Sequence, residues 1–335
     1  MSELVTLNHG SGGKQAHALI TNMFAKKFGM TDPMTDSAVL REPGFTLAFT
    51  TDSYVVDPLF FPGGNIGKLA VCGTVNDLSV SGAVPKYISA SFIIEEGFPL
   101  KELEIISDSM AEEANLAGVK IVTGDTKVVG RGKCDKLFIT TAGIGLLKPE
   151  HEHISAGKKI GSGDRLIVSG PLGNHAIAVL GARNNLSFSS SVVSDCASLN
   201  HMIQGVLHEC DQVHFMRDLT RGGLVAVLYE LLQITLSDLI IDEISVPVDD
   251  PVKGLCEVLG FDPFYLANEG KILIVAGEAE HKKVLDILRS IPSGEKSAVI
   301  GEVTDVHRGN VILNTFSGGK RILDIPSGVQ LPRIC

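Results

Sequence analysis

The sequence lacks several features that would place it in a common functional class. Tryptophan is absent, and aromatic residues make up only 5% of the chain. No apolar run is long enough to span a bilayer and no signal-peptide pattern is present, so we expect a cytoplasmic protein. No two cysteines follow the C-x-x-C spacing of zinc sites and dithiol motifs, so we expect free thiols. The six cysteines are Cys72, Cys134, Cys196, Cys210, Cys256 and Cys335.

Basic residues are also scarce. Lysine and arginine total 29 against 39 aspartates and glutamates, which gives a net charge of −10. This balance argues against nucleic acid or an anionic membrane as the main partner. Glycine is plentiful at 36 residues, so the backbone can approach a ligand closely at many positions. The 335 residues, 44% of them hydrophobic, suit two domains with buried cores.

Apolar periodicity predicts a layered α/β (α+β) protein, because strand patterns alternate with helix patterns along the chain. The polar, glycine-rich segment between Leu147 and Asp164 marks a domain boundary. We therefore expect an N-terminal domain (1–155), a C-terminal domain (156–325) and a flexible tail (326–335). His151 and His153 in the boundary segment are interpreted as solvated linker residues rather than metal ligands. We expect strands over 46–56, 86–95, 119–122, 136–147, 165–169, 239–244, 271–275, 298–303 and 310–313, helices over 15–28, 66–83, 99–117, 222–233, 252–259 and 279–290, and a turn over 58–65.

A glycine-rich segment opens the chain as His9-Gly10-Ser11-Gly12-Gly13-Lys14. It is not a P-loop, because Gln15 stands where serine or threonine should follow the lysine. The backbone N–H groups of adjacent glycines can still cradle an anion. A glycine flap over phosphates and a plain flexible terminus are both open.

Three aspartates lie in apolar or glycine-rich surroundings, where an unpaired buried charge would be costly. Asp52 is late in an expected strand, Asp77 follows Asn76 in an expected helix, and Asp125 stands just after the strand predicted over 119–122. Magnesium combines carboxylates with substrate phosphates, so these residues suggest a Mg²⁺–nucleotide site. Capping of helices and turns is the alternative.

Two further segments carry candidate chemistry. Arg217-Asp218-Leu219-Thr220-Arg221-Gly222-Gly223 runs into a helix, which suits an anion site, although Thr220 or Asp218 could simply be the N-cap. Glu269 precedes an apolar strand and is either a general base or a solvated turn residue.

The chain ends in Leu331-Pro332-Arg333-Ile334-Cys335 without a helical pattern. Such a tail should be extended and mobile, and ten residues reach roughly 33–36 Å. It is either a frayed terminus or an arm that carries the Cys335 thiol into a cleft.

Several segments in this order resemble one family. They are His9-Gly10-Ser11-Gly12-Gly13, Thr51-Asp52-Ser53-Tyr54-Val55-Val56, Phe60-Phe61-Pro62-Gly63-Gly64-Asn65-Ile66-Gly67-Lys68-Leu69-Ala70, Gly124-Asp125-Thr126-Lys127-Val128-Val129, Ser194-Asp195-Cys196-Ala197, Arg221-Gly222-Gly223, Ala267-Asn268-Glu269-Gly270-Lys271 and Pro332-Arg333-Ile334-Cys335. The set is similar to the HypE family of carbamoyl dehydratases, which act in hydrogenase maturation and belong with the aminoimidazole-ribotide and selenophosphate synthetases. Gly173-Asn174-His175-Ala176 departs from the Gly-Asp-His-Gly expected there, and Leu219 stands where relatives often have proline.

The resemblance implies a two-domain synthetase-like fold whose N-terminal sheets pair across a homodimer, with ATP and Mg²⁺ bound near that interface. It implies that HypF places a carbamoyl group on Cys335 and that ATP phosphorylates the thiocarboxamide oxygen. Loss of phosphate then leaves a thiocyanate. The cyanide passes to iron held by HypC and HypD, as a ligand of the NiFe-hydrogenase centre.

The resemblance also implies residue roles. Asp52, Asp77 and Asp125 would hold Mg²⁺, Glu269 is the candidate base, and Lys127 would orient or neutralise charge. Two other functions stay open. One is a synthetase that acts on a small molecule and has an idle tail. The other is a non-catalytic carrier that binds nucleotide only to control its docking to partners. Further nucleotide contacts are expected from Gly10, Gly12, Gly13, Asn76, Thr126, Asp218 and Arg221.

Overall fold

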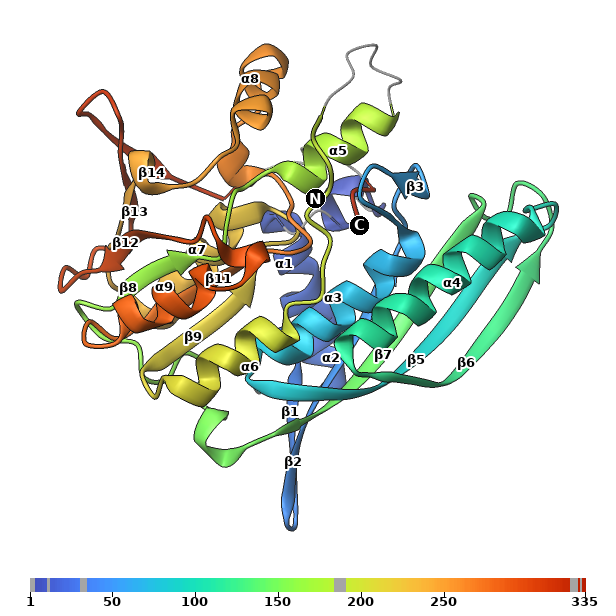
Figure 1. Ribbon diagram of the computed structural model, residues 1–335, viewed down its shortest axis with the longest axis horizontal. Helices are drawn as coiled ribbons and strands as arrows, with labels where there is room; N and C mark the ends of the chain where they lie inside the picture. Colours follow the sequence, from blue (N-terminus) through green and yellow to red (C-terminus); the bar gives the residue numbers. More distant parts are fainter. Residues whose placement is uncertain (1–3, 11–12, 31–34, 184–190, 326–330, 332) are drawn as a thin grey trace.

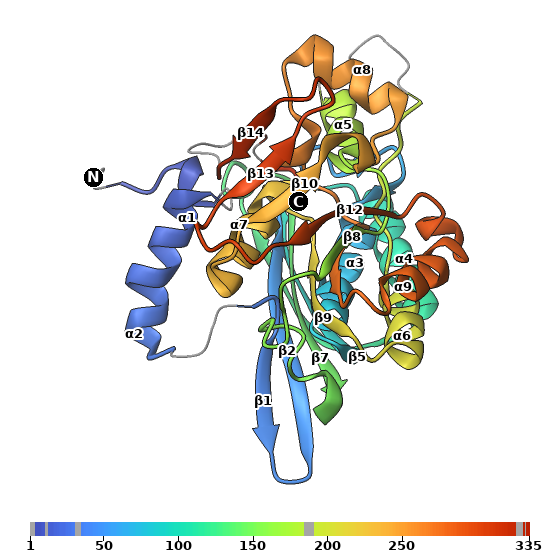
Figure 2. The same cartoon turned by 90° about the vertical axis from the view of Figure 1, so that its left-hand side faces the viewer.

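The computed structural model describes residues 4–10, 13–30, 35–183, 191–325, 331 and 333–335. Gly12 and most of the predicted tail lie outside this set. The described residues form two large sheets, one from each half of the chain, with helices packed against both (Figures 1 and 2). The mixed α/β architecture predicted from the sequence is confirmed.

The first half forms a five-stranded sheet in the order β1-β2-β7-β5-β6. β5 and β6 are parallel, and the other neighbouring pairs are antiparallel. Helices α3 and α4 cover one face of this sheet (Figure 1). The elements are η1 (Leu7–Gly10), α1 (Lys14–Leu19), the π-helix η2 (Ile20–Ala25), α2 (Lys26–Phe28), β1 (Ala38–Glu42), β2 (Phe45–Tyr54), β3 (Phe60–Phe61), β4 (Gly64–Asn65), α3 (Ile66–Val80), β5 (Ala83–Glu95), α4 (Leu100–Ala117), β6 (Lys120–Val129) and β7 (Leu137–Leu147).

Helix α3 is buried along nearly its whole length, because its residues are apolar or small on all sides. The Asn65 side chain caps it by accepting hydrogen bonds from the N–H groups of Gly67 and Lys68, at 2.9 and 3.1 Å. Gly67 must be small, because an added Cβ would lie 2.4 Å from the carbonyl oxygen of Ile106 on α4. α3 also contacts the second half of the chain, so it lies where the two halves meet.

The second half forms a seven-stranded sheet in the order β14-β13-β10-β12-β8-β11-β9. A core with α7 lies on one face, and a core with α6 and α9 lies on the other. The elements are η3 (Pro149–His151), β8 (Arg165–Val168), α5 (Asn174–Arg183), α6 (Asn200–Glu209), β9 (Val213–Asp218), α7 (Gly223–Thr235), β10 (Leu239–Asp242), η4 (Glu243–Ser245), α8 (Asp250–Leu259), η5 (Pro263–Tyr265), β11 (Ile272–Ala276), α9 (His281–Arg289), η6 (Pro292–Gly294), β12 (Ala298–Val303), β13 (Val311–Asn314) and β14 (Lys320–Leu323).

Strand register decides which face of the first sheet each side chain occupies. The row of paired residues through Asp52 on β2 reaches Gly124 on β6, and the next row reaches Asp125. Adjacent rows point to opposite faces of a sheet. Asp52 shares the α3 side with its neighbours Thr50 and Tyr54, whereas Asp125 points the other way.

The face of the first sheet on which Asp125 lies, opposite α3, also carries large apolar side chains. Phe49, Ile144 and Tyr87 are paired directly across β2, β7 and β5. Their exposed fractions are 39%, 37% and 49%, respectively. An apolar row of this kind across three strands suits contact with another protein surface.

Several predicted boundaries need correction. β6 continues to Val129, so Asp125 lies inside an edge strand and not after one. The expected turn over 58–65 contains the β3–β4 pair, and the helix expected over 15–28 is the consecutive segments α1, η2 and α2. β1, α5, α6, β9 and β14 were not predicted, because polar or glycine-rich residues interrupt their patterns.

His151 and His153 are not solvated, contrary to the prediction. Both are partly buried, and their ring nitrogens lie 3.2 Å from the carbonyl oxygen of Gly82 and 2.9 Å from that of Val213. They help to join the two halves. None of the helices in the described part of the chain combines the length and apolar character of a membrane-spanning segment.

Candidate functional site

Three carboxylates from separate segments meet between the two halves of the chain. Asp36 precedes β1, Asp77 lies within α3, and Asp218 ends β9. One oxygen of each lies within 4.8 Å of the others. Asp77 and Asp218 are therefore not helix caps, and Asp36 joins them although the sequence did not single it out.

Neighbouring polar groups fix this carboxylate cluster. The Thr50 hydroxyl lies 2.7 Å from Oδ2 of Asp77 and 2.8 Å from the carbonyl oxygen of Asp36. Arg217 is buried and pairs with Asp36 at 2.9 Å and with Glu230 at 3.1 Å. Arg217, which lies in the segment that suggested an anion site, thus neutralises protein carboxylates.

The carboxylate cluster has the electrostatics of a cation site. Burial, followed by repulsion from neighbouring aspartates, raises the pKa of Asp77 and of Asp218 well above the usual value. Burial also raises the pKa of Asp36 against the opposing effect of Arg217. Asp52 contributes to all three shifts, so it lies close to the cluster. A divalent cation would relieve this repulsion, and carboxylate oxygens are the ligands that Mg²⁺ prefers.

Asp125, Thr126 and Lys127 do not join the cluster within one chain. They lie exposed on β6, with the Lys127 ammonium 2.9 Å from the Asp125 carboxylate. Hydrogen bonding from Lys127 lowers the pKa of Asp125, which is opposite to the shift at Asp77. The roles predicted for these three residues remain predictions.

The end of the tail is docked beside the carboxylate cluster. The Val55 N–H donates to a backbone carboxylate oxygen of Cys335 at 3.1 Å, and the Asp57 N–H donates to the Arg333 carbonyl oxygen at 3.2 Å. Arg333 Nε donates back to the Val55 carbonyl at 2.9 Å, and its guanidinium pairs with Asp135. Backbone contacts thus hold the last residues along the end of β2.

Docking places the Cys335 thiol among charged groups. Burial raises its pKa to about 12, with Glu269, Asp52 and Asp218 adding to the increase and Arg221 opposing it. In turn, Cys335 is the largest contributor to the raised pKa of Arg221. The thiol therefore lies close to these four side chains.

Glu269 is buried, with an exposed fraction of 3%. Among the described residues, its Oε1 has no hydrogen-bond partner. Burial first, and then neighbouring Cys196 and carboxylates, raise the pKa of Glu269 well above the usual value. The Asp195 carboxylate fixes its backbone by accepting from the N–H groups of Glu269 and Gly270, each at 3.2 Å. A solvated turn residue, the alternative from the sequence, is therefore excluded.

Arg221 lies in the tight turn that joins β9 to α7. Gly222 and Gly223 have φ values of +83° and +59°, which favour glycine, and an added Cβ on Gly223 would lie 2.5 Å from the Leu266 carbonyl oxygen. Gly222 is the N-cap residue, so Thr220 is not. Arg221 Nη1 donates to the Gly10 carbonyl oxygen at 3.3 Å, so the glycine-rich segment lies next to Arg221. Gly13, the N-cap of α1, follows in extended conformation.

Asn76 has a different environment from the one expected. Its Nδ2 donates to the Ala197 carbonyl at 3.0 Å, and its Oδ1 accepts from the Leu199 N–H at 2.8 Å. The side-chain amide thus ties α3 to the segment that precedes α6. A nucleotide contact through Asn76 remains a prediction.

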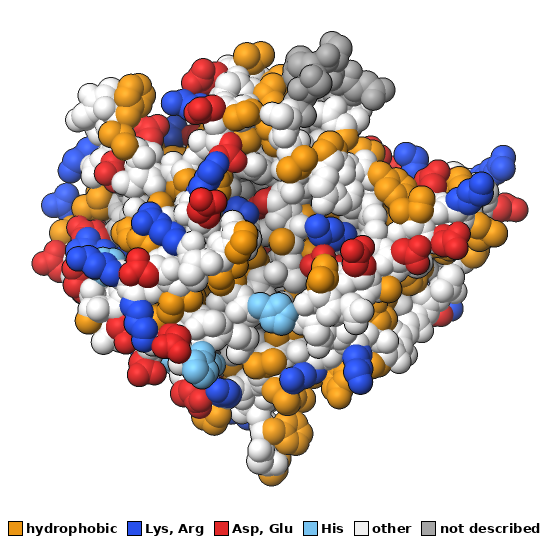
Figure 3. Space-filling model, in the orientation of Figure 1, with side chains coloured by type: hydrophobic (Ala, Val, Ile, Leu, Met, Phe, Trp, Pro, Cys, Tyr) orange, Lys and Arg blue, Asp and Glu red, His pale blue; other side chains and the backbone are white. Residues whose placement is uncertain are grey.

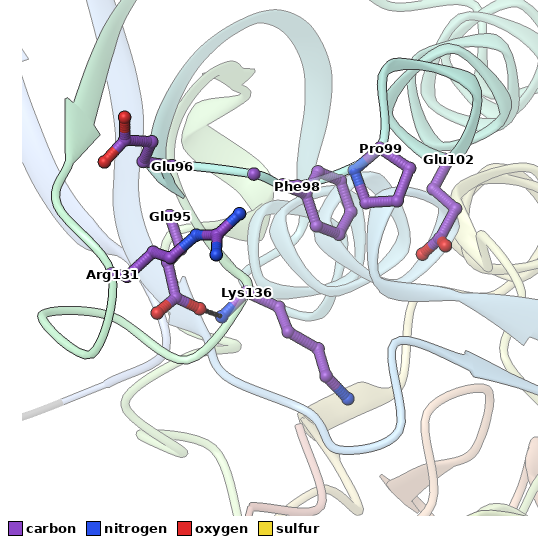
Figure 4. Close-up of a pocket in the computed structure, with 8 residues that line it drawn as sticks. Glu95, Glu96, Phe98, Pro99, Glu102, Arg131 and Lys136 are labelled. Atoms are coloured by element: carbon purple, nitrogen blue, oxygen red, sulfur yellow. Dashed lines mark hydrogen bonds between the residues drawn. The ribbon is translucent and has the colours of Figure 1, made fainter.

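A separate open pocket of about 370 Å³ lies at the ends of β5, β6 and β7 (Figure 4). Glu95, Glu96, Glu102, Arg131 and Lys136 line it with mixed charge. The carboxylate of Glu95 accepts from the Lys136 N–H at 3.2 Å and thereby stabilises the β6–β7 turn. None of the lining residues belongs to the carboxylate cluster, so this pocket is not the candidate site.

The two sheets and the carboxylate cluster between them define a synthetase-type enzyme fold. Residues 34–147 match the N-terminal domain of AIR synthase related proteins, and residues 161–314 match their C-terminal domain. A carbamoyl dehydratase HypE from Rhodobacter capsulatus is 49% identical over 338 residues, which cover 99% of this chain and 98% of that protein. The chain belongs to the HypE family of carbamoyl dehydratases, which are enzymes of hydrogenase maturation.

Solved structures agree with this assignment. A chain in the crystal structure of a HypE–HypF complex has a TM-score of 0.86 and 45% identity, covering 92% of this chain and 100% of that one. A hydrogenase maturation protein HypE solved in complex with ATP has a TM-score of 0.83 and 43% identity, covering 99% of this chain and 100% of that one.

Proposed function

We propose that this chain dehydrates a carbamoyl group carried on its own Cys335, with consumption of ATP. The thiocarboxamide R–S–C(O)NH₂ and ATP become the thiocyanate R–S–C≡N, ADP and phosphate, and the two nitrogen-bound protons are released. The observation that supports this most directly is the docked Cys335, which lies beside Glu269, Arg221 and the carboxylate cluster. An idle terminus would not need a partly buried site among reactive groups.

The carboxylate cluster suits a metal-bound nucleotide. Asp36, Asp77 and Asp218 offer oxygen ligands to Mg²⁺, with Asp52 close by. Burial and then repulsion raise the pKa of Asp77 and of Asp218, and a cation would offset both effects. When bound, Mg²⁺ neutralises phosphate charge and orients the transferring group. The hydrogen bond between Arg221 and the Gly10 carbonyl supports a phosphate-binding role for both the guanidinium and the glycine-rich segment. The relative solved with ATP supports nucleotide binding.

Glu269 is the candidate base. Phosphorylation turns the amide oxygen into a good leaving group, and a proton must then leave the amide nitrogen. The partnerless Oε1 of Glu269 is available to accept it. Arg221 lies close enough to Cys335 to neutralise negative charge that develops there.

Loading and dehydration require different tail positions. Because burial raises the pKa of the docked Cys335 thiol to about 12, the docked thiol stays protonated and is a poor nucleophile. The carbamoyl group is therefore acquired with the tail outside the cleft, where HypF can reach it. The relative in the HypE–HypF complex supports that partner. Delivery of the cyanide group to a HypC–HypD complex, in the cytoplasm, completes the proposed cycle.

A homodimer would complete the site. The exposed row of Phe49, Ile144 and Tyr87 suits pairing of the N-terminal sheets of two copies. Asp125 and Lys127 lie on the same face, so they can reach a nucleotide only from the second copy. Elsewhere, acidic and basic side chains are intermixed over the surface seen in Figure 3, which does not suit a polyanion.

Intact-mass analysis tests the proposal. After incubation with HypF, carbamoyl phosphate and ATP, the peptide containing Cys335 should gain a carbamoyl group and then lose one water. The Cys335→Ser variant, which keeps the size of the tail, should show no such product. Carbamoylation without dehydration, despite ATP hydrolysis, would favour a small-molecule synthetase, and no ATP hydrolysis on a loaded tail would favour a carrier.

A further inference from the structure

His175 on α5 makes a hydrogen bond to the backbone of the docked tail. Its ring is fully buried, and Nε2 lies 2.8 Å from the carbonyl oxygen of Ile334. Nδ1 lies 2.8 Å from the Ser194 hydroxyl, and the Phe61 ring packs edge-on at 5.3 Å. Each polar atom of the imidazole therefore has one defined partner, and one of these belongs to the residue before Cys335.

The partners determine the hydrogen positions on the ring. A carbonyl oxygen can only accept, so Nε2 carries the hydrogen. Burial lowers the pKa of His175, which favours the neutral ring and leaves Nδ1 as an acceptor for the Ser194 hydroxyl. The Ser194 oxygen in turn accepts from the Cys196 N–H at 3.1 Å. In this arrangement both ring nitrogens of His175 have a hydrogen-bond partner while the tail is docked. When the tail departs, the hydrogen on Nε2 loses its partner, the Ile334 carbonyl.

The same segment also holds the candidate base. Ser194 is followed by Asp195, whose carboxylate accepts from the backbone N–H groups of Glu269 and Gly270. Lys271 lies 3.4 Å from that carboxylate. Hydrogen bonds therefore run from the Ile334 carbonyl through His175 and the 194–196 segment to the backbone of Glu269. The same set of contacts therefore positions the sulfur of Cys335 and Glu269, which is proposed to accept the proton from the amide nitrogen.

We propose that His175 is a positioning residue that recognises the docked tail through the Ile334 carbonyl and aligns Cys335 with Glu269. His175 contacts the tail backbone and not the thiol, so free, carbamoylated and dehydrated tails can all dock through the same hydrogen bond to the Ile334 carbonyl. The inference rests on the proposed function for its catalytic meaning, but the docking contact can be measured without any reaction.

Two substitutions separate the two hydrogen bonds of the ring. In His175→Gln, the side-chain amide nitrogen extends to the place of Nε2 and can still donate to Ile334. In His175→Asn, the shorter amide matches Nδ1, keeps the Ser194 contact and leaves the Ile334 carbonyl unpaired. The rate at which iodoacetamide alkylates Cys335 in the full-length protein, followed by peptide mass, reports the undocked fraction.

We expect His175→Asn to raise the Cys335 alkylation rate roughly three- to tenfold, the change expected for loss of one hydrogen bond. His175→Gln should stay within about twofold of the unsubstituted protein. The control is His153→Asn, which removes a comparable Nε2 contact to the Val213 carbonyl and should leave Cys335 protected. Equal alkylation rates for His175→Asn and the unsubstituted protein, or equal increases in both His175 variants, would overturn the assignment.

The measurement distinguishes failure of this inference from failure of the proposed function. Alkylation needs neither HypF nor ATP, so it tests docking even if no thiocyanate forms. If docking behaves as expected, single-turnover dehydration by the loaded protein should be slower in His175→Asn than in His175→Gln. Unchanged dehydration in His175→Asn would refute the alignment role of His175.

Discussion

Replacement of Asp77 by asparagine should stabilise the metal-free protein at alkaline pH. One carboxylate oxygen of Asp77 lies within 4.8 Å of one of Asp218, and both residues have a pKa raised well above the usual value. Two full charges at that separation repel by about 3.5 kcal/mol at an effective dielectric constant of about 20. Asparagine removes one charge and can still accept the hydrogen bond of Thr50. Allowing for partial protonation, we expect a gain of about 1–3 kcal/mol in free energy of unfolding at pH 8.

The sign follows from linkage. A carboxyl group whose pKa is raised on folding contributes stability below its unfolded pKa of about 4, and that contribution is lost as pH rises through the folded pKa. The melting temperature of the protein in EDTA should therefore fall between pH 5 and pH 8. Asp77→Asn should reduce this fall, with a difference of roughly 2–6 °C at pH 8.

Differential scanning fluorimetry with EDTA or Mg²⁺ measures both effects. Mg²⁺ should raise the melting temperature of the unsubstituted protein at pH 8 and have a weaker effect on Asp77→Asn. Asp125→Asn is the control, because Asp125 is exposed and its pKa is lowered, so its removal should give no stabilisation in EDTA. A flat pH dependence in EDTA, or a less stable Asp77→Asn protein at pH 8, would refute the electrostatic interpretation.

Two more outcomes are expected. Glu269→Gln should lower thiocyanate formation by roughly 10²–10⁴, the usual contribution of a general base, while ATP affinity measured by calorimetry is retained; dehydration at an undiminished rate would exclude Glu269. Ile144→Asp should convert the proposed homodimer to monomer in sedimentation velocity, because it places a charge in the exposed apolar row; an unchanged sedimentation coefficient would place the interface elsewhere.

Local sequence patterns were sufficient to predict the strand that carries Asp52 and the helix that carries Asp77. Alternation predicted the strand and apolar content predicted the helix, and both signals depend only on neighbouring residues. Asp36 gave no such signal, because it lies in a polar stretch before β1 and is recruited by a buried arginine 181 positions later, at Arg217. Its place in the site depends on tertiary packing alone.

The orientation of Asp125 shows a second limit of local patterns. The strand was expected to end at Val122, because Gly124 interrupts the β-branched run, but edge pairing with β5 continues it to Val129. Whether Asp125 shares a face with Asp52 depends on register across β7 and β5, which periodicity along one strand cannot give. The role of His175 was hidden for a similar reason, since its partner Ile334 is 159 positions away.

Burial and the carboxylates around the docked tail keep the free Cys335 thiol uncharged. Burial is the main cause of the raised pKa of Cys335, and ionisation of the thiol would also add a negative charge next to Glu269, Asp52 and Asp218. A carbamoylated sulfur has no ionisable proton, so the loaded tail cannot become a thiolate at any pH. The same carboxylates then serve the reaction, because a base with a raised pKa accepts a proton readily. On the proposed function, these carboxylates suppress nucleophilic chemistry at the empty thiol and promote proton removal from the loaded one.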